Sequence, residues 1–309
     1  MTAHDQHPCR AEGGFTLVEL IISMGILLVV SAAVMSGVSN MSQLSMTMTN
    51  RSDMFAAIRN ASALLQQEVG QAGRISLPGN VTLAGAAGPG VATVSVSSAA
   101  NMFVGEWIDV DTGQNREVVQ LTAVNAGGNT ITANFGLAHA NGSGVSVAGG
   151  FAAGVVPPAV ANGSTAWVLK IFGDINGNGN MVYVEYTCDI ANARLTRNQM
   201  AWNAGAKPAP TVDQILVDDL QANPNNEACF VYQTQTVNGT PFVTGVAITL
   251  TVQSRERDPS TRQFQRESKA LLNVAPRNVF NVWQMASLQV TNRVQPTPAQ
   301  VTALLPPLS

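Results

Sequence analysis

The sequence predicts an α+β protein in which a long N-terminal helix packs on an antiparallel β-sheet and a small all-β subdomain is inserted. Three observations lead to this fold. An apolar run begins at Phe15, an amphipathic pattern of helical period follows it, and after Arg74 short alternating runs are separated by Gly and Asn. The expected parts are a leader (1–14), the helix (15–73), the inserted β subdomain (74–156), the sheet domain (157–290) and a Pro-rich tail (291–309).

Composition narrows the functional classes. Of the 309 residues, 46% are hydrophobic and only 11% are charged, which excludes a highly charged disordered chain. The formal net charge is −3, so we expect no nucleic-acid partner. Beyond the leader the chain has one histidine, His139, and we expect it in an exposed loop. The sequence offers no catalytic constellation, and we predict a protein that is not an enzyme.

The helix begins with a segment long enough to cross a membrane. Residues 15–38 include a single charged side chain, that of Glu19. As a helix these residues would extend about 36 Å, which covers the hydrocarbon core of a bilayer. A plain single-span anchor is the simplest interpretation, but it does not explain a carboxylate at the fifth position of the run.

Residues 14–20, GFTLVEL, resemble the cleavage and methylation motif of type IV prepilins. The resemblance implies cleavage after Gly14 by a prepilin peptidase and N-methylation of the new N-terminus at Phe15. It also implies a single-pass protein of the inner membrane with an extracytoplasmic domain, which reaches the pilus or cell surface after assembly. Other minor and major pilins would be its partners.

Glu19 would be the fifth residue of the mature chain. A carboxylate in hydrocarbon costs several kcal/mol unless it has a partner. The free amine of Phe15 in a neighbouring subunit would supply one and would fix the register of filament assembly. The alternative is that Glu19 reaches the headgroups from its place near the end of the span.

The helical pattern continues to about Ala72, and Gly70 and Gly73 are possible stops. Residues 64–73 (LLQQEVGQAG) and 268–278 (SKALLNVAPRN) resemble the helix end and the last sheet strand of PilW-like minor pilins. J-type minor pseudopilins of type II secretion are also similar. The predicted apolar face of the helix comprises Leu44, Met48, Phe55, Ile58, Leu65 and Val69.

The region 74–156 reads as a small β-barrel or sandwich. Its alternating residues include Val94, Val96, Ile108 and Val110, and a turn follows at residues 125–129. We interpret it as an insertion that either binds a ligand at the cell surface or only packs. The tail from residue 296 onward is rich in Pro and is expected to be extended or mobile.

Cys188 and Cys229 are the cysteines of the mature chain, and each lies in a strand-like run. In an extracytoplasmic domain such a pair predicts a disulfide, with two buried free thiols as the alternative. Over their separation of 41 residues the bridge would contribute about 4 kcal/mol.

Residues 174–185 match the twelve-residue calcium-loop pattern D-x-[DN]-x-[DN]-G-x5-E. Calcium is therefore the one candidate cofactor. The alternative is an Asn-Gly hairpin loop without metal, because its flanks read as strands and only two of the ligands are charged. The candidate ligands are Asp174, Asn176, Asn178, Asn180 and Glu185.

Two carboxylate pairs, Asp109/Asp111 and Asp218/Asp219, could serve as acid and base, but we expect solvated side chains. The sequence therefore predicts a minor type IV pilin that takes part in pilus assembly as a structural subunit. A minor pseudopilin, or an adhesin or ligand-binding module anchored by the same helix, is the alternative.

Overall fold

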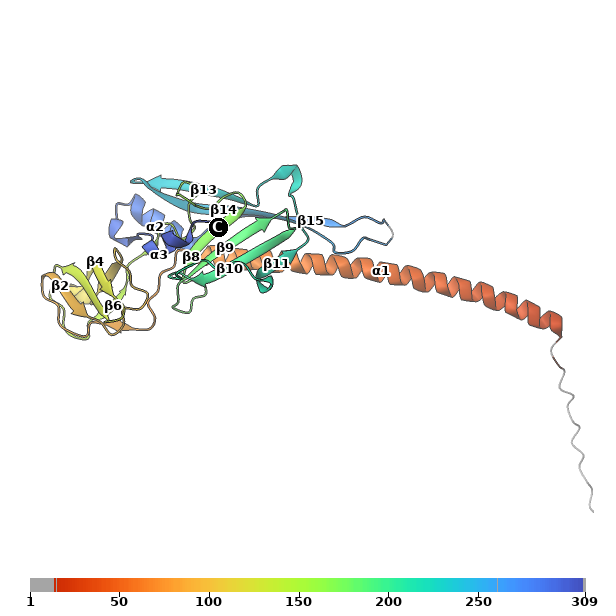
Figure 1. Ribbon diagram of the computed structural model, residues 1–309, viewed down its shortest axis with the longest axis horizontal. Coiled ribbons are helices and arrows are strands. Elements are labelled where there is room, and N and C mark those ends of the chain that lie inside the picture. The colour runs from red at the N-terminus through yellow and green to blue at the C-terminus, as the bar shows by residue number, and fades with distance from the viewer. Residues whose placement is uncertain (1–13, 15, 260, 308–309) are drawn as a thin grey trace, which may run out of the picture.

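The computed structural model describes residue 14, residues 16–259 and residues 261–307. It confirms the α+β fold. One helix, α1 (Leu17–Gln71), extends far beyond a body of antiparallel sheets, and a separate small β unit lies at the end of the body away from the start of α1 (Figure 1).

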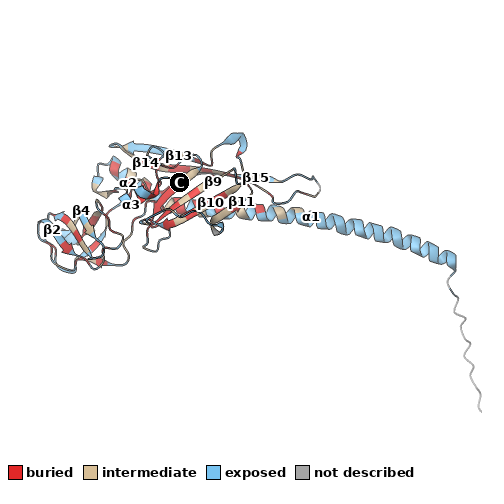
Figure 2. Cartoon of the chain, in the orientation of Figure 1, coloured by how far each residue is buried: buried red, intermediate tan, exposed pale blue. Residues whose placement is uncertain are grey.

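Helix α1 has two differently exposed parts. Of its described residues the first buried one is Met54, and Ile58, Leu65 and Val69 continue the buried face at helical spacing. Figure 2 shows the preceding part of α1 exposed along its length. The predicted apolar face therefore begins too early: Leu44 and Met48 precede the first buried residue and are exposed. Phe55 is also exposed, because the position after the buried Met54 is rotated by about 100° around the helix.

The helix ends close to where the sequence predicts. Gly73 follows with a φ of +81°, and a Cβ added there would lie 2.9 Å from a side-chain carbon of Val279. Both the left-handed backbone and the close packing require glycine at this exit. Gly70, the other predicted stop, lies inside the helix.

Two four-stranded antiparallel sheets cover the last turns of α1 and share one apolar core with it. In the first sheet the order is β11-β10-β9-β8. In the second, β14 lies between β13 and β15, and β12 also pairs with β14, beyond the first residue of β13. The strands are β8 (Val168–Gly173), β9 (Val182–Asp189), β10 (Arg194–Ala201), β11 (Ile215–Asp218), β12 (Leu220–Gln221), β13 (Phe230–Val237), β14 (Thr240–Gln253) and β15 (Arg266–Val274).

The inserted region forms a sheet of order β1-β6-β3-β4-β5-β2 with its own apolar core. A bridge between Leu83 and Val96 joins the two outer strands, so the sheet closes as a small barrel. The alternating apolar residues predicted for it lie in or next to its strands. These are β1 (Val81–Thr82), β2 (Gly90–Ser95), β3 (Trp107–Val110), β4 (Glu117–Asn125), β5 (Thr130–Phe135) and β6 (Gly144–Val147).

The C-terminal region differs from the prediction. The last sheet strand ends at Val274, and α2 (Arg277–Ser287) begins where the strand was expected to continue. The tail is not an extended segment: β16 (Val294–Gln295) pairs in parallel with β7 (Gly150–Phe151), and α3 (Ala299–Leu304) follows. Val301, Leu304 and Leu305 are buried in an apolar cluster with residues of the body, which holds the tail in place.

Candidate functional site

The N-terminal end of α1 carries the predicted processing site. Gly14 lies just before the helix, whereas Phe15, the expected site of methylation, lies outside the described residues, as does the leader before Gly14. Thr16 is the N-cap of α1 and Glu19 is its third helical residue. The Thr16 amide donates a hydrogen bond of 3.0 Å to the Glu19 carboxylate, and the Glu19 amide donates one of 3.3 Å to the Thr16 hydroxyl.

This reciprocal pair is a capping box, a role of Glu19 that the sequence analysis missed. The Thr-x-x-Glu spacing at the start of an apolar helix is the signal that could have revealed it. Within the chain Glu19 thus stabilises the start of α1. Its carboxylate remains exposed at the helix surface, where a neighbouring group can reach it.

The apolar segment, residues 17–38, follows directly. It lies in the only described helix that is long and apolar enough to cross a membrane. Every side chain in this segment is exposed, including Leu17, Ile21 and Leu28. An apolar surface of this size is unfavourable in water, so lipid or other helices must cover it.

At its other end, α1 is tied to the first sheet by a buried polar group. The Glu68 carboxylate accepts hydrogen bonds from Arg197 Nε at 3.1 and 3.0 Å and from Nη2 at 2.5 Å. The Tyr186 hydroxyl also donates to it. Burial, together with the charge of Glu68, raises the pKa of Tyr186 above its usual range. These bonds orient the exposed part of α1 relative to the body.

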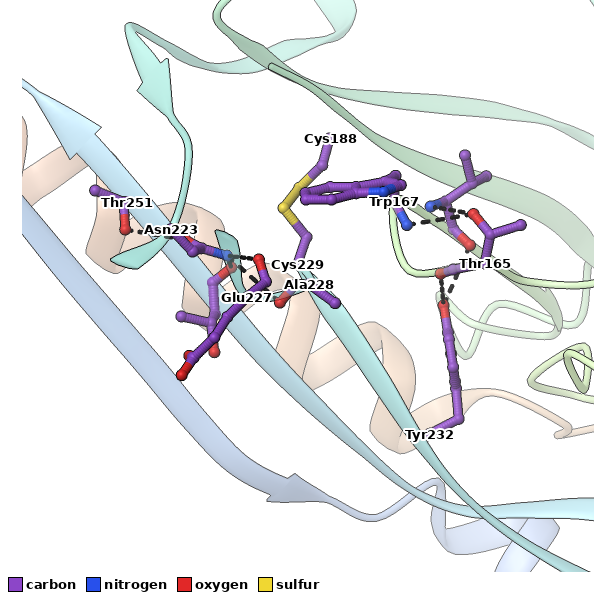
Figure 3. Close-up of a disulfide and its surroundings, with 11 residues drawn as sticks. Thr165, Trp167, Cys188, Asn223, Glu227, Ala228, Cys229, Tyr232 and Thr251 are labelled. Carbon is purple, nitrogen blue, oxygen red and sulfur yellow. Dashed lines mark hydrogen bonds between the residues drawn. A yellow bond between two sulfur atoms is a disulfide. The ribbon is translucent and has the colours of Figure 1, made fainter. Parts of the chain in front are cut away.

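Cys188 and Cys229 form a disulfide, as predicted. Cys188 lies in β9 of the first sheet, and Cys229 directly precedes β13 of the second, so the bridge joins the two sheets (Figure 3). Hydrogen bonds hold the neighbouring segments in place. The Tyr232 hydroxyl donates to the carbonyl of Thr165 at 2.9 Å, and Asn223 donates to the carbonyl of Thr249 at 2.9 Å.

The predicted calcium loop is a hairpin loop between β8 and β9. Asp174 is fully buried, and its carboxylate accepts hydrogen bonds from the amides of Asn178 and Gly179 and from the Ser76 hydroxyl, at 3.0, 3.2 and 2.7 Å. Arg74 lies 3.6 Å from the same carboxylate. Asp174 therefore joins this loop to the segment that follows α1.

The structure does not bring Glu185 to this loop. Glu185 lies in β9 opposite Lys170, three residues beyond the pair Gly173–Val182 and thus about 10 Å along the strand. Its carboxylate instead accepts hydrogen bonds from Lys207 at 2.7 Å and Tyr183 at 2.8 Å.

The three asparagines lie in the loop itself, and the Asn178 side chain accepts a hydrogen bond of 3.0 Å from the Asn180 amide. Within the described part of the chain, no three His, Cys, Asp or Glu side chains gather as a metal site. Calcium binding remains a prediction, and it would depend on Asp174, Asn176, Asn178 and Asn180 without Glu185.

His139 is not an exposed loop residue. Its side chain is fully buried, with Nε2 2.5 Å from the Glu117 carboxylate and Nδ1 3.3 Å from that of Asp111. The loop folds inward because the backbone of His139 pairs with that of Ala87, which closes this end of the barrel. The contacts with these two carboxylates give His139 a structural role. The sequence around His139 does not reveal them, because the carboxylates lie in other parts of the barrel.

The carboxylate pairs also have structural partners. Asp109 lies buried in β3, contrary to the prediction of a solvated loop, and hydrogen bonds from Arg116 lower its pKa. Asp218 and Asp219 are only partly shielded, and Arg255 lies 2.7 and 3.6 Å from them. Asp109, Asp218 and Asp219 thus take part in ion pairs with arginines.

Comparison with models of protein families matches residues 9–35 to the prokaryotic N-terminal methylation motif. No curated protein and no solved structure matches the chain. The matched region contains the Gly14–Phe15 junction, the capping box and most of the apolar segment. The N-terminus is therefore that of a type IV pilin- or pseudopilin-like substrate of prepilin peptidase, and the motif indicates a structural, membrane-anchored protein with pilin-type partners.

Proposed function

We propose that the protein is a minor type IV pilin of the PilW-like kind, a structural subunit that takes part in the initiation of pilus assembly. One observation carries the proposal. An apolar segment that no residue in the described part of the chain covers directly follows a methylation motif, and the same helix is fixed into a folded body at its other end.

In this proposal prepilin peptidase cuts after Gly14 and the new N-terminus at Phe15 is methylated. The apolar segment first lies in the inner membrane, with the body outside the cytoplasm, and then packs among the helices of other pilins. Such head-to-tail contacts form an open helical filament. The Glu19 carboxylate pairs with the Phe15 amine of a neighbouring subunit and sets the register.

The variant Glu19→Gln tests this role of Glu19. Glutamine preserves a capping box, so α1 and membrane insertion should be retained, whereas the charge that would pair with an amine is lost. We expect the variant at normal levels in membranes and strongly depleted in sheared filaments. The matched control is Glu227→Gln, which neutralises an exposed carboxylate of the body. Equal incorporation of both variants would contradict the register role.

A minor pseudopilin of type II secretion shares this design. The composition of sheared pili distinguishes the two functions, because a minor pilin should co-purify with them. Loss of secretion without loss of pili in a deletion strain would favour the pseudopilin.

A second function, ligand display, is supported by the barrel. It has its own core and lies at the end of the body away from the start of α1 (Figure 1). Val81 and Val145 are ladder partners, so the two ends of the barrel lie close together, and the test variant replaces residues 81–147 by a short linker. If the barrel serves display, the shortened chain should still enter filaments while cells lose adhesion. Failure to enter filaments would make the barrel part of the assembly machinery.

A further inference from the structure

The connection between β14 and β15, residues 254–265, extends past the sheets in the direction of the N-terminal part of α1 (Figure 1). We refer to it as the basic loop. Its base lies beside α1, because Arg255 and Glu256 line the same hollow as Asn50 and Asp53 of the helix. The basic loop thus extends from the body on the same side as the exposed part of α1, which carries the apolar segment.

Positive charge is concentrated in this loop and in the first residues of β15. Residues 255–269 hold five of the sixteen Lys and Arg residues of the chain and only three of its nineteen acidic residues, in a protein with a net charge of −3. Of those three, Asp258 is buried and accepts hydrogen bonds from the Thr261 amide and the Gln265 side chain, at 3.1 and 2.7 Å. The five basic residues are Arg255, Arg257, Arg262, Arg266 and Lys269.

Three of these arginines are available to a partner. Arg255 is held by Asp218 and Asp219 at the base of the loop. Arg257, Arg262 and Arg266 are exposed and, in the described part of the chain, form no ion pair. They line an open hollow of about 520 Å³ with Gln263 and Phe264. The guanidinium group of Arg257 lies over the Phe264 ring, 5.3 Å from its centre.

The axial position of the loop indicates its partner. Asn50 of α1 lies beside the base of the loop, and Val38 is the last residue of the apolar segment. The two residues are 12 positions apart, which corresponds to about 18 Å along the helix. The two arms of the loop lie side by side as far as Asp258, whose amide donates a hydrogen bond of 2.9 Å to the carbonyl of Gln263, so the loop extends at least three residues, or about 10 Å, beyond Arg255. The loop therefore ends about 8 Å from the level of Val38, a distance comparable with the depth of the headgroup layer that would border the hydrocarbon core of a surrounding bilayer.

We propose that the basic loop binds the anionic headgroups of phospholipids around the inserted helix. Arg257, Arg262 and Arg266 contact phosphate groups, and Phe264 rests at the interface. This inference rests on the proposed insertion of the apolar segment. Binding would hold the body at a fixed height and tilt over the membrane before assembly, and release of the loop would accompany extraction of the subunit into a filament.

The test uses the mature full-length protein in vesicles of phosphatidylcholine, with or without roughly 30% phosphatidylglycerol. A fluorophore at Gln263→Cys is read by quenching from a lipid with a headgroup nitroxide, and a fluorophore at Gln235→Cys, on the exposed part of β13, gives the background. We expect at least about twofold stronger quenching at position 263 in the anionic vesicles, reduced by high salt.

The double variant Arg257→Gln/Arg262→Gln should lose this quenching. The matched control, Arg59→Gln/Arg277→Gln, removes the same charge from exposed arginines elsewhere and should retain it. Vesicle flotation separates the two proposals: a chain that does not float refutes membrane insertion. A chain that floats with equal quenching in both lipid mixtures overturns the lipid role and favours an acidic surface of a neighbouring subunit as the partner of the loop.

Discussion

Glu68 is the residue that connects the exposed helix with the sheets. Its carboxylate is buried and its charge is balanced by Arg197, with the Tyr186 hydroxyl as an additional donor. Removing one member of a buried ion pair leaves the other charge without compensation. The Glu68–Arg197 pair thus adds a directional polar contact to the apolar core that α1 shares with the sheets.

We therefore expect Glu68→Gln to lower the free energy of unfolding by about 3 kcal/mol. Urea unfolding of the protein in detergent measures this change. Glu256→Gln, which neutralises an exposed carboxylate, should change it by less than about 0.5 kcal/mol. Similar effects of the two substitutions would show that the Glu68–Arg197 pair does not stabilise the fold.

Glu106 makes the stability of the barrel region depend on pH. Its side chain is buried, the Phe103 amide donates a hydrogen bond of 3.2 Å to Oε2, and Oε1 has no partner in the described structure. Burial raises the pKa of Glu106 to about 8. The folded protein keeps this proton at pH values where the unfolded chain has already released it.

Stability should therefore be greatest below the unfolded pKa and fall as the pH rises from about 5 to 8, by up to about 1.4 kcal/mol per pH unit. Glu106→Gln cannot ionise, and its unfolding free energy should lack this component. Unfolding of both proteins at pH 5 and pH 8 gives the comparison. Parallel pH dependence would mean that Glu106 is ionised in the folded protein.

At the residue scale, the sequence identified some of the functional and structural side chains, but not the side chains that they contact. Glu19 and Asp174 stand out because their neighbours are apolar or form turns. His139 was misplaced because its partner Glu117 lies in another strand, 22 residues away in the sequence. Glu106 was missed because its segment pairs with a strand distant in sequence, where the Leu121 amide donates a hydrogen bond of 2.8 Å to the Glu106 carbonyl. Only folding brings such groups together.

At the element scale, β16 attaches the tail to the barrel. Gln295 is buried, accepts a hydrogen bond of 2.9 Å from the Trp107 amide and donates bonds of 2.6 Å to the carbonyls of Trp107 and Ala148. Arg293 adds a contact of 3.5 Å with Asp109. The tail is thus one of the connections that hold the barrel to the body.

We expect Gln295→Ala to destabilise this junction by about 1–3 kcal/mol, because buried backbone groups lose their partners. Hydrogen exchange should accelerate at the Trp107 amide and remain slow at Ile108, which lies in the core of the barrel itself. The exposed Gln300→Ala serves as the control. Equal acceleration at both amides would show that the barrel does not fold as a separate unit.

The disulfide joins two sheets that share one core. Cys188→Ser/Cys229→Ser should lower the free energy of unfolding by up to about 4 kcal/mol, because the bridge closes a chain separation of 41 residues. A reducing agent should destabilise the wild type by a similar amount and leave the double variant unchanged. A wild type that is insensitive to reduction would favour two free thiols.

Periodicity explains which elements could be predicted. The helix and the strands of the barrel follow patterns of period 3.6 and 2, which local sequence reveals. The short α3 follows Pro298, and its buried face consists mainly of Val301 and Leu304. Two apolar residues in a Pro-rich segment give too weak a pattern, and the packing partners that order this helix lie elsewhere in the chain.

For the whole molecule, the structure separates three parts along one axis. The apolar segment lies at one end, the body with its two sheets in the middle and the barrel at the opposite end (Figure 1). The sequence predicted these parts along the chain, whereas their arrangement in space, the order of the strands and the attachment of the tail depend on long-range contacts.

The most direct test is the mass of the N-terminal peptide of the protein isolated from native membranes or sheared filaments. We expect a peptide that begins at N-methylated Phe15, with the leader through Gly14 removed. A Gly14→Glu variant should retain the leader. A peptide that begins at Met1 in the wild type would contradict the account, reduce the helix to an uncleaved anchor and make display of the barrel the leading function.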